Sequence, residues 1–278
     1  MELLEQFRGV LAGAALADAR GLGELNCVAR SYRDYRGFSA EDLTERMLGW
    51  FRASGEQPDA MTRESMQLLG RGYTFERAAA DARLGVPERF RTNDRALLRT
   101  LPAGLVRYHD DIHLIGEARL ICGLTHADEE CKMASVAINL ALAHLLMVGT
   151  DGLIEEISEF VAPRMPEFGK QITSIEAINP AELRLSGRAL DTAQAALWFA
   201  YYCDSYRELQ RVIDMGEGDA DVLLPLASAL VGAHLGYGGL ADGNWPASPS
   251  VEYMLQLADQ IYDLSQSEPE IERERSQD

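Results

Sequence analysis

The sequence predicts an all-α fold, formed by one compact domain of about a dozen helices. Apolar residues recur at spacings of three and four along nearly the whole chain, which is the helical period. Strand-like alternation is scarce, and we find neither a repeat of fixed period nor a linker rich in Pro, Gly or Ser. With 278 residues, 47% of them hydrophobic, the chain is long enough to bury one sizeable core.

The helix boundaries follow from capping residues, glycines and prolines. Ser39, with Asp42 three residues later, forms a loose capping box at the start of one helix. Apolar residues surround the segment from Asp128 to Val148, so we expect that helix to lie at the centre of the fold. The predicted helices span residues 3–21, 39–54, 62–70, 74–85, 93–107, 111–124, 128–148, 151–163, 187–203, 205–214, 223–235 and 250–264. We assign residues 1–264 to the domain and 265–278 to a charged tail that is expected to be disordered.

Charge and composition exclude several classes of protein. The chain has 26 basic and 44 acidic residues, so its net charge of −18 disfavours nucleic acid and anionic membranes as partners. No apolar run reaches the roughly 20 residues of a membrane-spanning helix, and no signal peptide is visible. The four cysteines show no paired spacing and are expected to be free thiols. We therefore expect a cytoplasmic protein.

Two predicted helices carry glycines four residues apart. Gly9 and Gly13 share one face of the first helix, and Gly232 and Gly236 share one face of a late helix. Small residues let two helices approach closely. The spacing is typical of ordinary tight packing, or of close approach that brings two walls of a ligand site together.

An acidic loop at residues 216–222 is the most informative local segment. Asp219 and Asp221 lie two residues apart just before a predicted helix, so both carboxylates can converge on one hard cation such as Mg²⁺. Either residue could instead cap the helix. Two carboxylates alone are too few to hold a pair of metal ions.

Two further polar positions are candidates for function. Thr125 and His126 join two predicted helices; the simpler interpretation is a cap by Thr125 or Asp128, with His126 in solvent. Asp18 lies on the otherwise apolar side of the first helix. A buried carboxylate needs a partner, which could be an arginine, backbone N–H groups or a metal-bound water.

Five segments, in this order, resemble the ADP-ribosylglycohydrolase family. The first helix resembles the family's opening helix, which ends in Gly-Asp-Ala-Leu-Gly, and residues 92–102 resemble its Thr-Asn-Gly-x-x-Met-Arg-x-x-Pro stretch. The Thr125-His126 pair before a long helix is also similar, as is the helical segment 186–198. Residues 217–222 and 232–236 resemble the Gly-Gly-Asp-x-Asp-Thr loop and its helix. The similarity spans residues 5–246.

The resemblance implies an all-helical hydrolase that uses a pair of Mg²⁺ or Mn²⁺ ions to cleave ADP-ribose from an amino-acid side chain. It implies Asp219 and Asp221 as metal ligands, with Asp18 in a supporting position. Asn93, Thr125, His126 and Gly218 would then contact the ligand; the residue that performs catalysis is not identified. The implied partners are ADP-ribose or an ADP-ribosylated protein.

The sequence also departs from the family pattern. No Thr-Asp-Asp-Thr motif, which supplies the second set of carboxylates, occurs anywhere in the chain. Val222 stands where the family has a liganding threonine, and Asp94 and Glu217 stand where it has loop glycines. These changes predict a degenerate active site. Two functions remain open: a weakened metal-dependent hydrolase, or an inactive pseudoenzyme that binds ADP-ribose or a protein partner.

Overall fold

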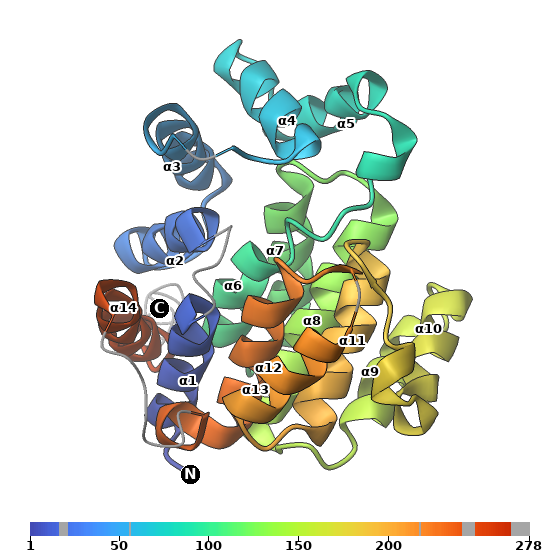
Figure 1. Ribbon diagram of the computed structural model, residues 1–278. Helices are drawn as coiled ribbons and strands as arrows, with labels where there is room; N and C mark the ends of the chain where they lie inside the picture. The colour runs from blue at the N-terminus through green and yellow to red at the C-terminus, as the bar shows by residue number, and fades with distance from the viewer. Residues whose placement is uncertain (17–21, 56, 217, 241–247, 268–278) are drawn as a thin grey trace, which may run out of the picture.

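The computed structural model describes residues 1–16, 22–55, 57–216, 218–240 and 248–267. This part of the chain contains fourteen α-helices, which pack into one body (Figure 1). The helices are α1 (Leu3–Leu16), α2 (Leu22–Tyr35), α3 (Ala40–Ala53), α4 (Ala60–Gly70), α5 (Phe75–Gly85), α6 (Leu101–Val106), α7 (Asp111–Gly123), α8 (Glu129–Met147), α9 (Leu153–Val161), α10 (Pro166–Thr173), α11 (Ala189–Tyr202), α12 (Tyr206–Met215), α13 (Leu223–Leu240) and α14 (Pro249–Ser265). Short 3₁₀ helices lie at Glu88–Phe90, Leu98–Thr100, Ser174–Ala177 and Pro180–Glu182. The all-α, single-domain prediction is confirmed.

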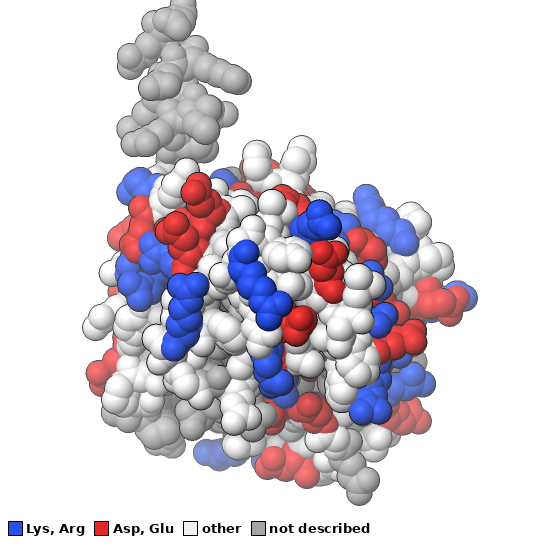
Figure 2. All heavy atoms as spheres, turned by 90° about the horizontal axis from the view of Figure 1, so that it is seen from above, with Lys and Arg blue, Asp and Glu red and all other residues white. Residues whose placement is uncertain are grey.

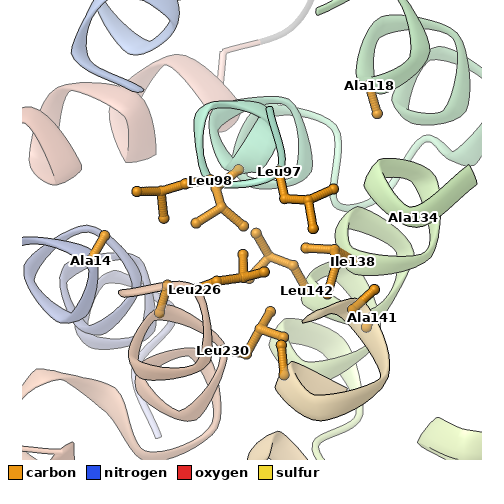
Figure 3. Packing of buried hydrophobic residues seen from close by; sticks show 14 of the residues in the cluster. Ala14, Leu97, Leu98, Ala118, Ala134, Ile138, Ala141, Leu142, Leu226 and Leu230 are labelled. Atoms are coloured by element: carbon orange, nitrogen blue, oxygen red, sulfur yellow. The ribbon is translucent and has the colours of Figure 1, made fainter. Parts of the chain in front are cut away.

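Helix α8 lies at the centre of the core, as its sequence predicts. Every residue from Met133 to Leu146 on this helix is buried. Figure 3 shows Ile138 and Leu142 of α8 pointing into the same cluster as Leu226 and Leu230 of α13. Both helices are long and apolar enough to cross a membrane, but most of each apolar window is buried inside the fold, as in the core helices of soluble proteins.

The glycines of α1 and α13 let the two helix backbones touch. A Cβ atom built on Gly9 would lie 2.2 Å from the carbonyl oxygen of Gly232, and one built on Gly232 would lie 2.1 Å from that of Gly9. Gly236 has a φ of +71°, so α13 bends there, one residue after the end predicted for this helix. The prediction of close helix contact is confirmed.

Three helix predictions differ from the structure. Residues 93–97 are not helical, because Asn93 forms an isolated bridge with Arg188 and turns follow; helical structure begins only at Leu98. Helices α2 and α10 were not predicted. Polar and charged residues are frequent in both segments, so the apolar period is weak there, and the two helices are stabilised by packing of one face.

A small piece of extended backbone brings two distant loops together. Strand β1 (Leu185–Ser186) pairs in parallel with β2 (Gly218–Asp219), so the acidic loop lies beside the start of α11. Gly218 has a φ of +144°, and a Cβ there would lie 2.0 Å from the carbonyl oxygen of Leu185. This pairing requires glycine at residue 218 and fixes the position of Asp219.

Charged side chains of both signs are interspersed on the face seen from above in Figure 2. The net charge of −18 therefore does not make this face uniformly acidic. Ser265, predicted as the first residue of the tail, is the last residue of α14. The end of the tail, residues 268–278, lies outside the described residues.

Candidate functional site

A chain of buried polar side chains runs from α2 to the start of α4. Arg99 is fully buried and forms a short ion pair with Glu24 of α2. A second nitrogen of Arg99 donates to the hydroxyl of Thr125, whose oxygen lies 2.8 Å from Nδ1 of His126. The other nitrogen of the His126 ring lies 2.9 Å from Oδ1 of Asn93. The buried segments therefore connect a core ion pair to a residue that reaches the surface.

The polarity of this chain is fixed by its arginine end. Because a guanidinium can only donate, the Thr125 hydroxyl accepts from Arg99 and donates to Nδ1 of His126. Nε2 of His126 then carries the proton and donates to Asn93. Burial lowers the pKa of His126 to about 4, against the opposing charge of Asp59, so the ring is neutral at pH 7. His126 is thus a positioned hydrogen-bonding group.

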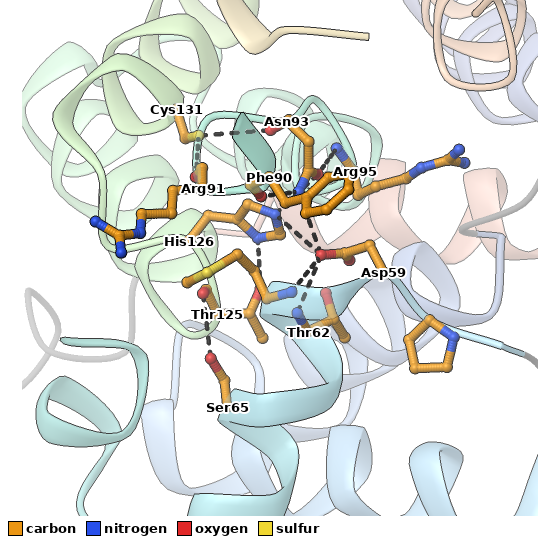
Figure 4. Close-up of polar contacts among 12 residues, drawn as sticks. Asp59, Thr62, Ser65, Phe90, Arg91, Asn93, Arg95, Thr125, His126 and Cys131 are labelled. Carbon is orange, nitrogen blue, oxygen red and sulfur yellow. Dashed lines mark hydrogen bonds and ion pairs between the residues drawn. The ribbon is translucent and has the colours of Figure 1, made fainter. Parts of the chain in front are cut away.

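Asp59 completes the chain (Figure 4). Its Oδ1 accepts from the backbone N–H groups of Met61 and Thr62 at the start of α4 and lies 3.3 Å from the amide nitrogen of Asn93. Burial by itself would raise the pKa of Asp59, but His126 and the hydrogen bonds from Thr62 outweigh it and lower the pKa. Oδ2 of Asp59 is buried and has no hydrogen-bond partner among the described residues.

Asp59 was missed by the sequence analysis, which opened this helix at Thr62. The signal was present, because an aspartate after Pro58 is a favoured N-cap. What the sequence could not indicate is that the cap also faces His126, whose Nε2 lies 3.5 Å from Oδ1 of Asp59.

The acidic loop meets an arginine. Nη2 of Arg95 lies 3.3 Å from Oδ2 of Asp221 and 3.6 Å from Oδ2 of Asp219. The Arg95 side chain is only 20% exposed, whereas the two carboxylates are about half exposed. The backbone N–H of Asp221 donates to Oδ1 of Asp219, which closes the turn ahead of α13. A guanidinium therefore lies against the carboxylates that the sequence assigns to a metal ion.

Asp94 is a third carboxylate beside this pair. It is 1% exposed, and its Oδ2 accepts from the hydroxyl of Thr192. Burial raises the pKa of Asp94 to about 7, and the charge of Asp219 adds to this effect, while Thr192 and Arg95 oppose it. A substantial fraction of Asp94 is therefore protonated near neutral pH.

Replacing Asp94 with Asn is expected to remove part of the pH dependence of stability. Because the pKa of Asp94 is raised on folding, the folded protein binds the proton more tightly, and this contribution falls as the pH rises from about 4 to 7. Asn keeps a hydrogen-bonding group for Thr192 without the charge, so Asp94→Asn should gain stability over wild type by up to a few kcal/mol above pH 7. Urea unfolding of both proteins at pH 5 and pH 8 tests this. An equal difference at the two pH values would contradict it.

The donor set does not fit a two-metal centre. Among the described residues no three His, Cys, Asp or Glu side chains are grouped so that they could hold a metal ion. The charge of Arg95 already opposes Asp219 and Asp221, and a divalent ion placed there would be repelled by the guanidinium. Asp18, the predicted supporting residue, lies outside the described residues, as does Glu217.

The predicted ligand-binding residues occupy different environments. Asn93 is partly exposed, while Thr125 and His126 are fully buried, so the alternative that His126 lies in solvent is wrong. Asp128, and not Thr125, caps α8 by accepting from the backbone N–H of Glu130. Asn93 is joined to this group through His126 and to the acidic loop through its neighbour Arg95, whose backbone N–H donates to Oδ1 of Asn93.

The comparisons with known proteins agree with this architecture. A solved structure described as an ADP-ribosylglycohydrolase-related protein complex superimposes with a TM-score of 0.72, covering 95% of this chain and 97% of its own. At 23% sequence identity this similarity shows the fold. No curated protein sequence matches the chain significantly. The model of the family described as ADP-ribosylglycohydrolase matches residues 24–270. The chain is therefore an ADP-ribosylglycohydrolase-like protein and belongs to that family.

Proposed function

We propose that this protein binds ADP-ribose, or the ADP-ribosyl group of a modified protein, without a metal ion and without hydrolysing it. The observation that carries the proposal is the position of Arg95 against Asp219 and Asp221. In a metal-dependent glycohydrolase, ions polarise the sugar oxygens and lower the pKa of a bound water. A guanidinium balances the carboxylate charge but, with a pKa above 12, generates no hydroxide.

The carboxylates retain a binding role. Asp219 and Asp221 are each about half exposed, so oxygen lone pairs remain accessible beside the contact with Arg95. Carboxylate oxygens accept hydrogen bonds from the vicinal hydroxyls of a ribose, and a charged acceptor makes such bonds strong. Asn93, partly exposed and held by His126 and Asp59, offers an amide at the neighbouring position.

Calorimetric titration with ADP-ribose tests this proposal. Affinity should be the same in excess EDTA and in excess Mg²⁺ or Mn²⁺. Replacing both Asp219 and Asp221 with Asn should weaken binding at least about tenfold, since a hydrogen bond to a charged group contributes about 1.5–3 kcal/mol. Glu167→Gln, on the exposed surface of α10, is the matched control and should leave affinity unchanged.

The metal-dependent hydrolase is the competing outcome. It would be established by release of ADP-ribose from an ADP-ribosylated protein in the presence of Mg²⁺, lost on chelation and in the Asp219→Asn variant. Absence of ADP-ribose binding under every condition would also overturn the proposal.

Arg95→Ala is expected to create a cation site that the wild-type protein lacks. The substitution removes the positive charge next to Asp219 and Asp221 and leaves their oxygens available to a hard cation. Titration with Mn²⁺, followed by electron paramagnetic resonance, should show uptake by the variant and none by wild type. Arg77→Ala, at an exposed position on α5, is the control. Tight uptake of two ions by the wild-type protein would contradict the prediction.

A further inference from the structure

We propose that a cavity lined by four arginines binds an anion that carries a phosphate or pyrophosphate group. The cavity has a volume of about 480 Å³, within the range of small-ligand sites. Its lining consists of Arg83, Glu88, Arg89, Arg91, Thr92, Asp128, Glu130 and Arg188. In a chain of net charge −18, a cavity with four guanidinium groups and three carboxylates is a local excess of positive charge.

Two of the arginines are held in place by the carboxylates of the lining. Nη2 of Arg83 lies 3.0 Å from Asp128, and Nη2 of Arg188 donates to Glu130 at 2.8 Å. Each pair uses one edge of a guanidinium fork and leaves other N–H groups. Nε of Arg83 is buried and has no hydrogen-bond partner among the described residues. An acceptor from outside the chain would satisfy it.

The other two arginines have no carboxylate partner in the described part of the chain. Nε of Arg91 donates to the carbonyl of Val86, which orients the guanidinium and leaves its Nη groups free of any ion pair with the acids described. The guanidinium of Arg89 lies 4.6 Å from the ring centroid of Phe90. Stacking of this kind holds the planar group without using its donors.

Planar forks with unused N–H groups are the geometry that recognises phosphate. Arginine donates two parallel hydrogen bonds to phosphate oxygens, and several arginines around one anion raise both affinity and specificity. Glu88, the carboxylate of the lining for which the described structure contains no ion pair, disfavours a highly charged or bulky anion on its side. We therefore infer a ligand that presents one or two phosphate groups to Arg89 and Arg91.

The cavity is distinct from the acidic loop but adjacent to it. Thr92 and Arg188 line the cavity, while their chain neighbours Asn93 and Gly187 face the candidate site. The bridge between Asn93 and Arg188 forms the wall between them, and a Cβ on Gly187 would lie 3.2 Å from Oδ2 of Asp219. Anion binding in the cavity requires no ligand at the carboxylates.

Calorimetric titration with inorganic pyrophosphate at low salt tests the cavity. Wild type should bind, and the double variant Arg89→Gln/Arg91→Gln should bind at least about tenfold more weakly, because two charged donors are lost. The double variant Arg63→Gln/Arg77→Gln removes the same charge from α4 and α5 outside the lining and should change affinity less than twofold. Equal melting temperatures of the two double variants would show that Arg91 is not needed for folding; Arg89→Gln alone, at an exposed position, provides the test if they differ.

The outcomes separate this proposal from the function proposed above. No binding of pyrophosphate by wild type, or the same loss in both double variants, would overturn the cavity site. Tighter binding of ADP than of pyrophosphate would identify the ligand as a nucleotide, and equal binding would identify a free anion. Replacing Asp219 and Asp221 with Asn should leave pyrophosphate affinity unchanged. If that variant and wild type both bind pyrophosphate while neither binds ADP-ribose, the cavity stands and the function proposed above fails.

Discussion

Gly232→Ala is expected to lower the free energy of unfolding by about 3 kcal/mol or more, because it places a methyl group inside the backbone of α1. The added Cβ would lie 2.1 Å from the carbonyl oxygen of Gly9, which no rotation of a side chain can relieve. The two helices must therefore separate, and the core between them loses contacts. Urea unfolding followed by circular dichroism measures the effect, and the midpoint should fall with the slope unchanged.

Gly116→Ala is the matched control for this packing. Gly116 lies inside α7, and a Cβ there would meet nothing within 4 Å. Alanine favours a helix by up to about 1 kcal/mol over glycine, so Gly116→Ala should be neutral or stabilising. Equal stability changes in Gly232→Ala and Gly116→Ala would mean that α1 and α13 are not in backbone contact.

Arg99→Met is expected to cost about 3–5 kcal/mol, the range found when one partner of a buried ion pair is removed. Arg99 is fully buried and donates to Glu24, Thr125 and the carbonyl oxygen of Cys122. Methionine has a similar length but supplies none of these donors. Thermal unfolding compares the variant with wild type.

An exposed arginine provides the control for Arg99. Arg77→Met removes the same charge from an i,i+4 pair with Asp81 on α5, where an exposed ion pair contributes less than about 1 kcal/mol. If the Arg99→Met and Arg77→Met variants melted at the same temperature, the buried chain from Glu24 to His126 would carry no stability. A second readout is the environment of His126: its ring should show altered NMR shifts in Arg99→Met but not in Arg77→Met.

The helical periodicity of the sequence predicted most of the fold. Helix α8 could be assigned to the centre because apolar residues cover all its sides, and a helix with that pattern must be buried on all sides. The glycines at 9, 13 and 232 indicated that α1 and α13 approach closely. Helix α2 escaped because polar and charged residues interrupt its apolar pattern, and residues 93–97 were misassigned because their contact with residues 187–189 is non-local.

The candidate site could be predicted only in part. The sequence identified Asp219 and Asp221 as paired carboxylates and Asn93 and His126 as polar residues of interest. It could not indicate that Arg95, 126 residues before Asp221, lies against that carboxylate, or that His126 is buried. The N-cap Asp59 likewise gains its place in the site only through the path of the chain.

The sequence by itself determined which segments are helical, which helix is most buried, which helices touch and which loop carries paired carboxylates, because these properties depend on the local order of residue types. The tertiary structure alone decided what those carboxylates face. A guanidinium from a loop distant in sequence occupies the position next to Asp219 and Asp221, and a second set of arginines surrounds a cavity behind the same loop. The physical reason is that charge pairing depends on distances of a few ångströms between residues far apart in the chain, and such distances are set by packing.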